Sequence, residues 1–219
     1  PSGRPSVSAT LAVIAEVKRR SPSKGVLNAT LDPIRTAQIY AGGGASCLSV
    51  LTDEKFFGGS KSDLIDARGA CTLPVLRKDF IVSISDVCDT RLMGADCILL
   101  IAAALSESEL AKFHHFSHEI GIDVLVEIRD ETELEFALGA GANLIGVNQR
   151  DLTTFEVDHT RAQRLAKMIP AGVVKVAESG VRNRDDAQGL RDVGYDAVLV
   201  GESLITSDDI ASTLQALLV

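Results

Sequence analysis

Short apolar runs alternate with longer amphipathic stretches along this chain. Eight of the runs predict β-strands, at residues 11–18, 47–53, 74–80, 97–103, 123–128, 144–148, 174–179 and 197–203. The runs are continuously apolar rather than alternating, so both faces of each predicted strand are expected to be covered, as in a parallel sheet.

The stretches between the runs have the spacing of amphipathic helices. The clearest are residues 32–44, 60–70, 106–121 and 131–141, and in the third of these apolar residues recur at 110, 113, 116 and 120. Ser106 with Glu109 predicts a capping box, and Asp130 predicts another helix start. Glycines follow several of these stretches, where they relieve the left-handed turn after a helix end.

The order of these elements predicts the fold class. Eight strand–helix units in 219 residues favour a single (β/α)8 TIM barrel of the α/β class, with one domain over residues 1–219. An open doubly wound sheet is the alternative. Such a sheet would usually carry a GxGxxG fingerprint after its first strand, and the sequence has none.

Composition narrows the classes of partner and the compartment. A net charge of −8 and the absence of Trp argue against a nucleic-acid-binding surface. No apolar run reaches the ~18 residues of a membrane span, and the first residues lack the apolar stretch of a signal peptide. The four cysteines form no CxxC pair and are interpreted as reduced, mostly buried thiols. We therefore expect a cytoplasmic protein that binds neither nucleic acid nor membrane.

Charged side chains interrupt the apolar pattern where strands end. In a barrel of this kind, functional residues lie at the carboxyl ends of the strands. The first, third, fifth and seventh strands supply five ionisable residues that would form one charged ring at the mouth: Glu16, Lys18, Lys78, Glu127 and Glu178. Two lysines and three carboxylates at close quarters suit proton transfer, because neighbouring charges and burial move their pKa values. The alternative is a set of salt bridges that only ties the strands together.

Two glycine-containing motifs indicate a phosphate site. ESG at residues 178–180 and VGES at residues 200–203 end the seventh and eighth strands, whose loops usually hold phosphate in this fold. Ser21, in the segment SPSKG, would close this site from the first strand. By contrast, the three histidines of HHFSH lie on a predicted helix without supporting ligands, and we expect no metal site.

Eight segments, in order from about residue 13 to residue 206, form a recognisable set: AEVKRRSPSKG, LSVLTDEKFFGGS, PVLRKDFIV, ADCILLIAAAL, LVEI, GANLIGVNQRDL, VAESGV and AVLVGESLI. Together they resemble indole-3-glycerol phosphate synthase, an enzyme of tryptophan biosynthesis. The resemblance implies a barrel of the ribulose-phosphate-binding type and a carboxy-lyase without cofactor or metal. Its phosphorylated small-molecule substrate would be 1-(2-carboxyphenylamino)-1-deoxyribulose 5-phosphate, which closes a ring with loss of carbon dioxide and water.

The same resemblance implies residue roles. Lys78 matches the general acid at the sugar carbonyl and hydroxyl, Glu127 a proton donor or acceptor in later steps, and Lys18 the lysine that holds the substrate carboxylate and can also transfer protons. The residues that orient substrate and catalytic groups would be Glu16, Asn148, Glu178 and Ser179. The phosphate side would be formed by Ser21, Arg150, Gly180, Gly201 and the backbone of Glu202. The contacts to the aryl ring would be Phe57, Phe80 and Leu99, for which simple core packing is the alternative.

Two other functions stay open at this point. The sister enzyme, phosphoribosylanthranilate isomerase, makes this substrate on the same barrel, but it would want a cysteine base on the first strand, where Glu16 and Lys18 stand. A non-catalytic barrel that binds phosphorylated ligands is the third possibility. It is suggested by the short segment before the first strand, which lacks most of the family's N-terminal extension and its covering helix. We expect a monomer.

Overall fold

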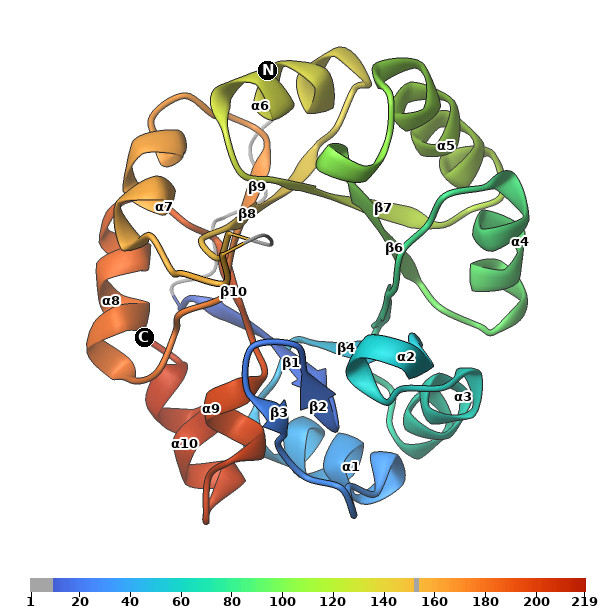
Figure 1. Ribbon diagram of the computed structural model, residues 1–219. Coiled ribbons are helices and arrows are strands. Elements are labelled where there is room, and N and C mark those ends of the chain that lie inside the picture. Colours follow the sequence, from blue (N-terminus) through green and yellow to red (C-terminus); the bar gives the residue numbers. More distant parts are fainter. Residues whose placement is uncertain (1–9, 152–153) are drawn as a thin grey trace.

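Eight parallel strands close into a barrel in the computed structural model, which describes residues 10–151 and 154–219. Around the barrel the strand order is β1-β10-β9-β8-β7-β6-β5-β4, and β4 pairs back onto β1 (Figure 1). This closure excludes the open doubly wound sheet. The barrel strands are β1 (Ala12–Val17), β4 (Cys47–Leu51), β5 (Val75–Lys78), β6 (Cys97–Ile101), β7 (Asp123–Ile128), β8 (Leu144–Asn148), β9 (Val174–Glu178) and β10 (Ala197–Val200).

A ring of helices covers the outside of the barrel (Figure 1). These helices are α1 (Pro33–Gly43), α3 (Lys61–Ala70), α4 (Ile84–Leu92), α5 (Glu107–Glu119), α6 (Glu131–Gly139), α7 (His159–Ala166), α8 (Arg184–Asp192) and α10 (Ile210–Leu217). The sequence pattern predicted all eight barrel strands. Its four clearest helical stretches correspond to α1, α3, α5 and α6. Shorter elements follow the strands, and the sequence did not predict them: the hairpin of β2 (Arg20–Ser21) and β3 (Gly25–Val26), α2 (Glu54–Phe57), the 3-10 turn η1 (Ala102–Ala104) and α9 (Glu202–Ile205).

The predicted helix signals are confirmed. Ser106 accepts a hydrogen bond from the backbone N–H of Glu109, whose carboxylate accepts one in return from the Ser106 backbone, so α5 begins with a capping box. The Asp130 side chain caps α6. Gly44 and Gly121 follow α1 and α5 with φ values of +96° and +75°, the left-handed conformation that glycine adopts without strain.

The apolar core has two parts. The larger part lies between the strands and the helices. The smaller part fills the barrel interior below the mouth and consists of Leu76, Leu99, Ile101, Leu125, Val176, Ala197 and Leu199. Side chains that point inward farther along the same strands therefore rest on an apolar floor, which excludes water from beneath them.

The cysteines are reduced, as the sequence predicted. All four cysteines are free thiols, and each is half-buried rather than fully buried. Burial raises the pKa values of the Cys47 and Cys97 thiols, which keeps both protonated. Within residues 10–151 and 154–219, no helix is long and apolar enough to span a bilayer.

Two buried tyrosines connect helices to neighbouring elements and allow a paired test of the fold. The Tyr40 hydroxyl of α1 donates to the Glu16 carbonyl of β1 at 3.0 Å, and the Tyr195 hydroxyl donates to the Ala162 carbonyl of α7 at 2.9 Å. Tyr40→Phe and Tyr195→Phe should each lower the free energy of unfolding by about 1 kcal/mol, because each leaves a buried carbonyl without this donor. Urea denaturation measures both. Unchanged midpoints would show that these hydroxyls do not contribute to stability.

Candidate active site

A large cavity opens at the carboxyl ends of the barrel strands. Its volume is about 770 Å³. All of the site residues predicted from the sequence line it: Glu16, Lys18, Ser21, Phe57, Lys78, Phe80, Leu99, Glu127, Asn148, Arg150, Glu178, Ser179, Gly180, Gly201 and Glu202. The structure thus brings the predicted positions together in one place, while the role of each in a reaction stays a prediction.

Lys78 lies at the centre of the charged ring. It is the last residue of β5, and its ammonium is 3.0 Å from Glu127 Oε2 of β7 and 3.0 Å from Glu178 Oε2 of β9. The Lys78 side chain is 14% exposed, and the two glutamate side chains are 4% and 2% exposed. One cation therefore serves two carboxylates that water hardly reaches.

This arrangement sets the protonation states of the three groups. Burial acts to lower the pKa of Lys78, but the charges of Glu127, Glu178 and Glu16 outweigh it, so that pKa is raised and the amine stays charged. Burial also acts to raise the pKa of Glu127, but the Lys78 charge and the Asn148 hydrogen bond outweigh it and lower that pKa. Glu178 keeps a raised pKa of about 8, because burial and the neighbouring Glu127 charge exceed the opposing effect of Lys78.

Glu178 occupies a place that glycine makes available. A Cβ on Gly146 of β8 would lie 2.1 Å from Glu178 Oε1, so any larger residue there would displace the carboxylate. This Oε1 atom is buried, and it accepts no hydrogen bond from the described residues. A buried carboxylate oxygen without a donor favours the neutral acid, in agreement with the raised pKa of Glu178.

A second ion pair lies beside the first. Glu16 of β1 and Lys18, just beyond that strand, contact each other through Oε1 and Nζ, with side chains 6% and 15% exposed. A Cβ on Gly201 would lie 2.4 Å from Glu16 Oε1, so this carboxylate too rests on a glycine. The five ionisable groups of the ring therefore form two salt-bridged sets, Glu16 with Lys18 and Lys78 with its two glutamates, and both sets line an open cavity rather than fill a closed core.

Asn148 connects the charged ring to the next loops. The Asn148 amide donates to Glu127 Oε1 at 3.1 Å, and its oxygen accepts from the Ser179 hydroxyl at 2.9 Å and from the Arg150 backbone N–H at 3.0 Å. Ser179 has a φ of +66° and Gly180 a φ of +77°, so the chain turns sharply after β9. One amide side chain thereby fixes the ends of β7, β8 and β9 relative to one another.

Cations and backbone groups gather at the side of the cavity near β10. Glu202, the first residue of α9, lies 3.7 Å from the Arg150 guanidinium and 3.6 Å from the Lys24 ammonium. Lys24, His159 and Arg182 also line the cavity, and the sequence reasoning did not select them. Lys24 lies three residues after Ser21 in the segment SPSKG, so the prediction of Ser21 for the phosphate site could have been extended to Lys24. His159 and Arg182 lie in segments whose charge pattern is that of an exposed helix.

An apolar wall faces the charged ring. The Phe80 ring lies 6.3 Å from the Phe57 ring and 6.1 Å from the Phe56 ring. Phe80 is 42% exposed, so its ring is not part of the core, whereas Leu99 is 2% exposed and belongs to the apolar floor. Phe56 and Leu51 also line the cavity and were missed by the sequence reasoning, although Phe56 directly precedes Phe57.

Asp53, which also ends a strand, does not line the cavity. Its side chain accepts hydrogen bonds from the backbone N–H groups of Phe56 and Phe57 and so caps α2.

Metal binding has no candidate in the described part of the chain, where no group of three or more His, Cys, Asp or Glu side chains could hold an ion. The histidines of HHFSH include His114, which is buried and lies beside His118 at 4.7 Å between ring centroids.

Solved structures with a similar fold are distant in sequence. A thiamine phosphate pyrophosphorylase from Pyrococcus furiosus superimposes with a TM-score of 0.71 at 14% identity, covering 94% of this chain and 93% of that one. An N-acetylmannosamine-6-phosphate 2-epimerase from Clostridium perfringens gives a TM-score of 0.69 at 14% identity, covering 90% of this chain and 88% of that one. Such distant likeness shows the TIM-barrel fold alone.

Curated relatives are much closer in sequence. Indole-3-glycerol phosphate synthase from Chlorobium phaeovibrioides is 48% identical over 203 residues, which cover 93% of this chain and 79% of the relative. Indole-3-glycerol phosphate synthase 1 of Streptomyces coelicolor is 52% identical, over 90% of this chain and 73% of the relative. The family model for indole-3-glycerol phosphate synthase matches residues 4–217. The chain therefore belongs to the indole-3-glycerol phosphate synthase family.

Proposed function

We propose that the cavity closes the indole ring with Lys78 as the principal acid and Glu127 as a proton acceptor. The reaction of the family converts 1-(2-carboxyphenylamino)-1-deoxyribulose 5-phosphate to indole-3-glycerol phosphate with loss of carbon dioxide and water, which makes the chain a carboxy-lyase of tryptophan biosynthesis. The observation that carries the residue assignment is the Lys78 ammonium held 3.0 Å from each of two buried carboxylates.

Lys78 would act where oxygen gains a proton. Its ammonium protonates the ketone oxygen while the aryl carbon that bears the carboxylate attacks the carbonyl carbon. Carbon dioxide then leaves and restores the aromatic ring. A second proton converts the resulting hydroxyl to water as it departs. The raised pKa of Lys78 ensures that the amine is charged before each turnover, and a preorganised cation stabilises the developing oxyanion by several kcal/mol.

Glu127 would act where carbon loses a proton. After the hydroxyl departs, the carbon next to the nitrogen gives up one hydrogen to complete the indole. Glu127 is ionised because Lys78 and Asn148 lower its pKa, so it can accept that proton. Two protons given and one taken balance the proton that decarboxylation consumes. Lys18 would hold the aryl carboxylate before it leaves and could transfer one of these protons, with Glu16 orienting Lys18.

The two ends of the substrate would lie against different walls. The aryl ring would contact Phe57 and Phe80, above the apolar floor that includes Leu99. The phosphate would bind near β10, where the Arg150 guanidinium supplies charge and Ser21 a hydroxyl. Backbone N–H groups would complete this site at Gly180, Gly201 and Glu202, since the Glu202 carboxylate itself would repel a phosphate.

The orienting residues and the setting of the chain complete the proposal. Asn148, Glu178 and Ser179 would fix the catalytic groups through the hydrogen bonds that join β7, β8 and β9. We further propose a single barrel domain over residues 1–219, of which residues 1–9 lie outside the described residues, working as a cytoplasmic monomer without cofactor. A net charge of −8 supports the absence of nucleic-acid partners. The isomerase alternative is not favoured, because Glu16 of β1 and Lys18, just beyond that strand, stand in place of a cysteine base.

Replacing Lys78 tests the acid. Lys78→Met should lower kcat by about 10³-fold, since it removes the proton source but keeps most of the side-chain volume. The indole fluorescence of the product measures turnover, and circular dichroism checks the fold. Lys61→Met is the control, because Lys61 pairs with Asp89 outside the cavity and is 62% exposed. A Lys78→Met protein that keeps its turnover would contradict the assignment.

The raised pKa of Glu178 leads us to predict how kcat/KM depends on pH. With a pKa of about 8, Glu178 is neutral at pH 7 and ionises as the pH rises through 8. Ionisation adds a negative charge beside Lys78, which raises the pKa of that amine further and weakens it as an acid. We therefore expect kcat/KM to fall above about pH 8 and to lose this limb in Glu178→Gln. If Glu178→Gln retains the limb, another group titrates there.

Gly146 tests the position of Glu178. Gly146→Ala should lower kcat by roughly 10- to 100-fold, because the added methyl pushes the Glu178 carboxylate away from Lys78. Gly69→Ala is the matched control, since Gly69 lies in α3 with open space around it. That control should keep its kcat and gain about 0.5–1 kcal/mol of stability. Wild-type kcat in Gly146→Ala would show that the site tolerates a displaced carboxylate.

A further inference from the structure

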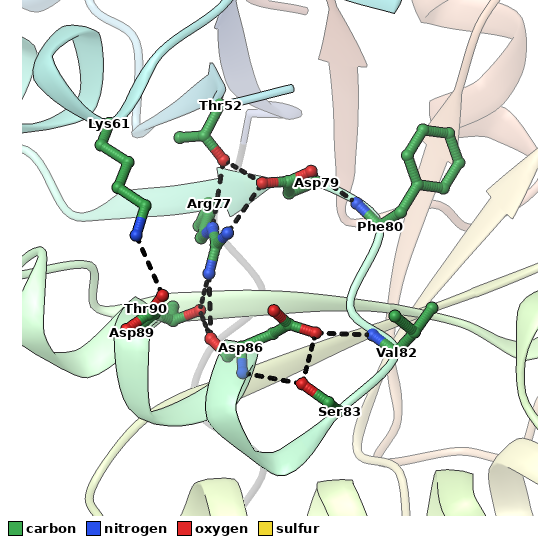
Figure 2. A network of polar contacts seen from close by, with 10 residues as sticks. All are labelled: Thr52, Lys61, Arg77, Asp79, Phe80, Val82, Ser83, Asp86, Asp89 and Thr90. Atoms are coloured by element: carbon green, nitrogen blue, oxygen red, sulfur yellow. Dashed lines mark hydrogen bonds and ion pairs between the residues drawn. The ribbon is translucent and has the colours of Figure 1, made fainter. Parts of the chain in front are cut away.

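A polar cluster centred on the buried Arg77 lies behind Lys78, on the outer side of β5, and one of its members, the half-buried Asp79, also lines the cavity. Arg77 is 5% exposed, and its side chain points away from that of Lys78, as neighbours on a strand do. The Arg77 guanidinium donates to Thr52 at 3.1 Å, to Asp79 at 2.8 Å, to Thr90 at 3.0 Å and to the Asp86 carbonyl at 2.9 Å. Figure 2 shows these contacts converging on Arg77 between the strand and α4.

Thr52 hydrogen-bonds to Lys78 and to the residues directly before and after it. Its backbone N–H donates to the Lys78 carbonyl at 3.1 Å. Its hydroxyl accepts from Arg77 and donates to Asp79 (Figure 2), the residues directly before and after Lys78. Thr52 is buried and does not line the cavity, so it acts on any bound molecule only through its neighbours.

The same cluster reaches the apolar wall. Asp79 Oδ1 accepts a hydrogen bond from the Phe80 backbone N–H at 2.8 Å, which fixes the chain as it leaves β5 (Figure 2). On the other side, Thr52 directly precedes Asp53, whose side chain caps the helix that carries Phe57. The hydrogen bond from the Thr52 hydroxyl to Asp79 therefore connects two segments of chain. One segment carries Lys78 and Phe80, and the other leads into the helix that carries Phe57.

We propose that Thr52, Arg77 and Asp79, here called the β5 clamp, are positioning residues for the reaction, which set Lys78 against Glu127 and Glu178 and set Phe80 relative to Phe57. This inference rests on the proposed role of Lys78. A buried ion pair is often no more stabilising than apolar residues of the same volume, so stability alone is a weak reason for Arg77 and Asp79. Their hydrogen bonds bracket one residue, and that residue carries the central ammonium of the cavity.

Two isosteric variants separate positioning from stability. Thr52→Val and Thr90→Val each remove one buried hydroxyl that accepts from Arg77, but only Thr52 contacts Asp79 and Lys78. Thr52→Val should lower kcat by about 10-fold or more, while Thr90→Val should stay within about two-fold of wild type. Thr52→Ser, which keeps the hydroxyl, should restore most of the turnover. Thermal unfolding checks that both valine variants fold and lose similar stability.

A pH profile supplies a readout that a purely structural role would not move. If Lys78 shifts away from Glu178, the pKa of Glu178 rises above about 8, because the Lys78 charge is what lowers it. The basic limb of kcat/KM should then move to higher pH in Thr52→Val and stay in place in Thr90→Val. If Thr52→Val does not fold, Thr52→Ala, which removes the same hydroxyl from a residue that does not line the cavity, should give the same two changes.

The outcomes are distinguishable from failure of the proposed function. Wild-type turnover and an inactive Lys78→Met are measured first in the same buffer. Turnover that survives Lys78→Met would overturn the acid and the β5 clamp together. With Lys78 essential, equal kcat values and equal pH limbs in Thr52→Val and Thr90→Val would overturn the β5 clamp alone. A lower kcat with a shifted limb in Thr52→Val only would support it.

Discussion

The site depends on one ammonium held between two buried carboxylates. Lys78 lies 3.0 Å from Glu127 and 3.0 Å from Glu178, and the three side chains are almost out of contact with water. One cation does not offset the cost of burying two carboxylate charges that also repel each other. One of the two acids therefore has a higher pKa and holds a proton more readily than the other. Asn148 stabilises charge on Glu127, while Glu178 has an oxygen with no donor among the described residues. The asymmetry assigns the charge to Glu127 and the proton to Glu178.

The barrel explains why these groups meet. Inward side chains of a closed parallel barrel come in layers from alternate strands, so β1, β5, β7 and β9 supply one layer at the mouth. Beneath it lies the apolar floor of the barrel interior, which keeps the effective dielectric low and makes each charge matter more. Glycine on neighbouring strands leaves room for the carboxylates, as at Gly146 beneath Glu178. The same β5 residue pattern directs Lys78 inward and Arg77 outward into the β5 clamp.

Much of this arrangement was predictable because it depends on local patterns. Continuous apolar runs marked the barrel strands, and charged residues at their ends marked the mouth. Other features depend on contacts that no local pattern encodes. The hairpin β2–β3 has strands of two residues each, too short for a periodic signal. Asp53 and Glu127 both follow apolar runs, yet Asp53 caps a helix and Glu127 lines the cavity. The partnership of Thr52 with Asp79 follows from the register of β4 against β5, and the pKa of Glu178 from groups on three strands.

The central claim is that Glu178 carries a proton at neutral pH while Glu127 does not. Carbon-13 NMR of protein labelled at the glutamate carboxyl carbons measures this directly, with Glu178→Gln and Glu127→Gln used to assign the two signals. We predict that the Glu178 signal titrates with a pKa of about 8 and that the Glu127 signal is already that of a carboxylate at pH 6. A Glu178 signal that is fully ionised at pH 6 would contradict the account.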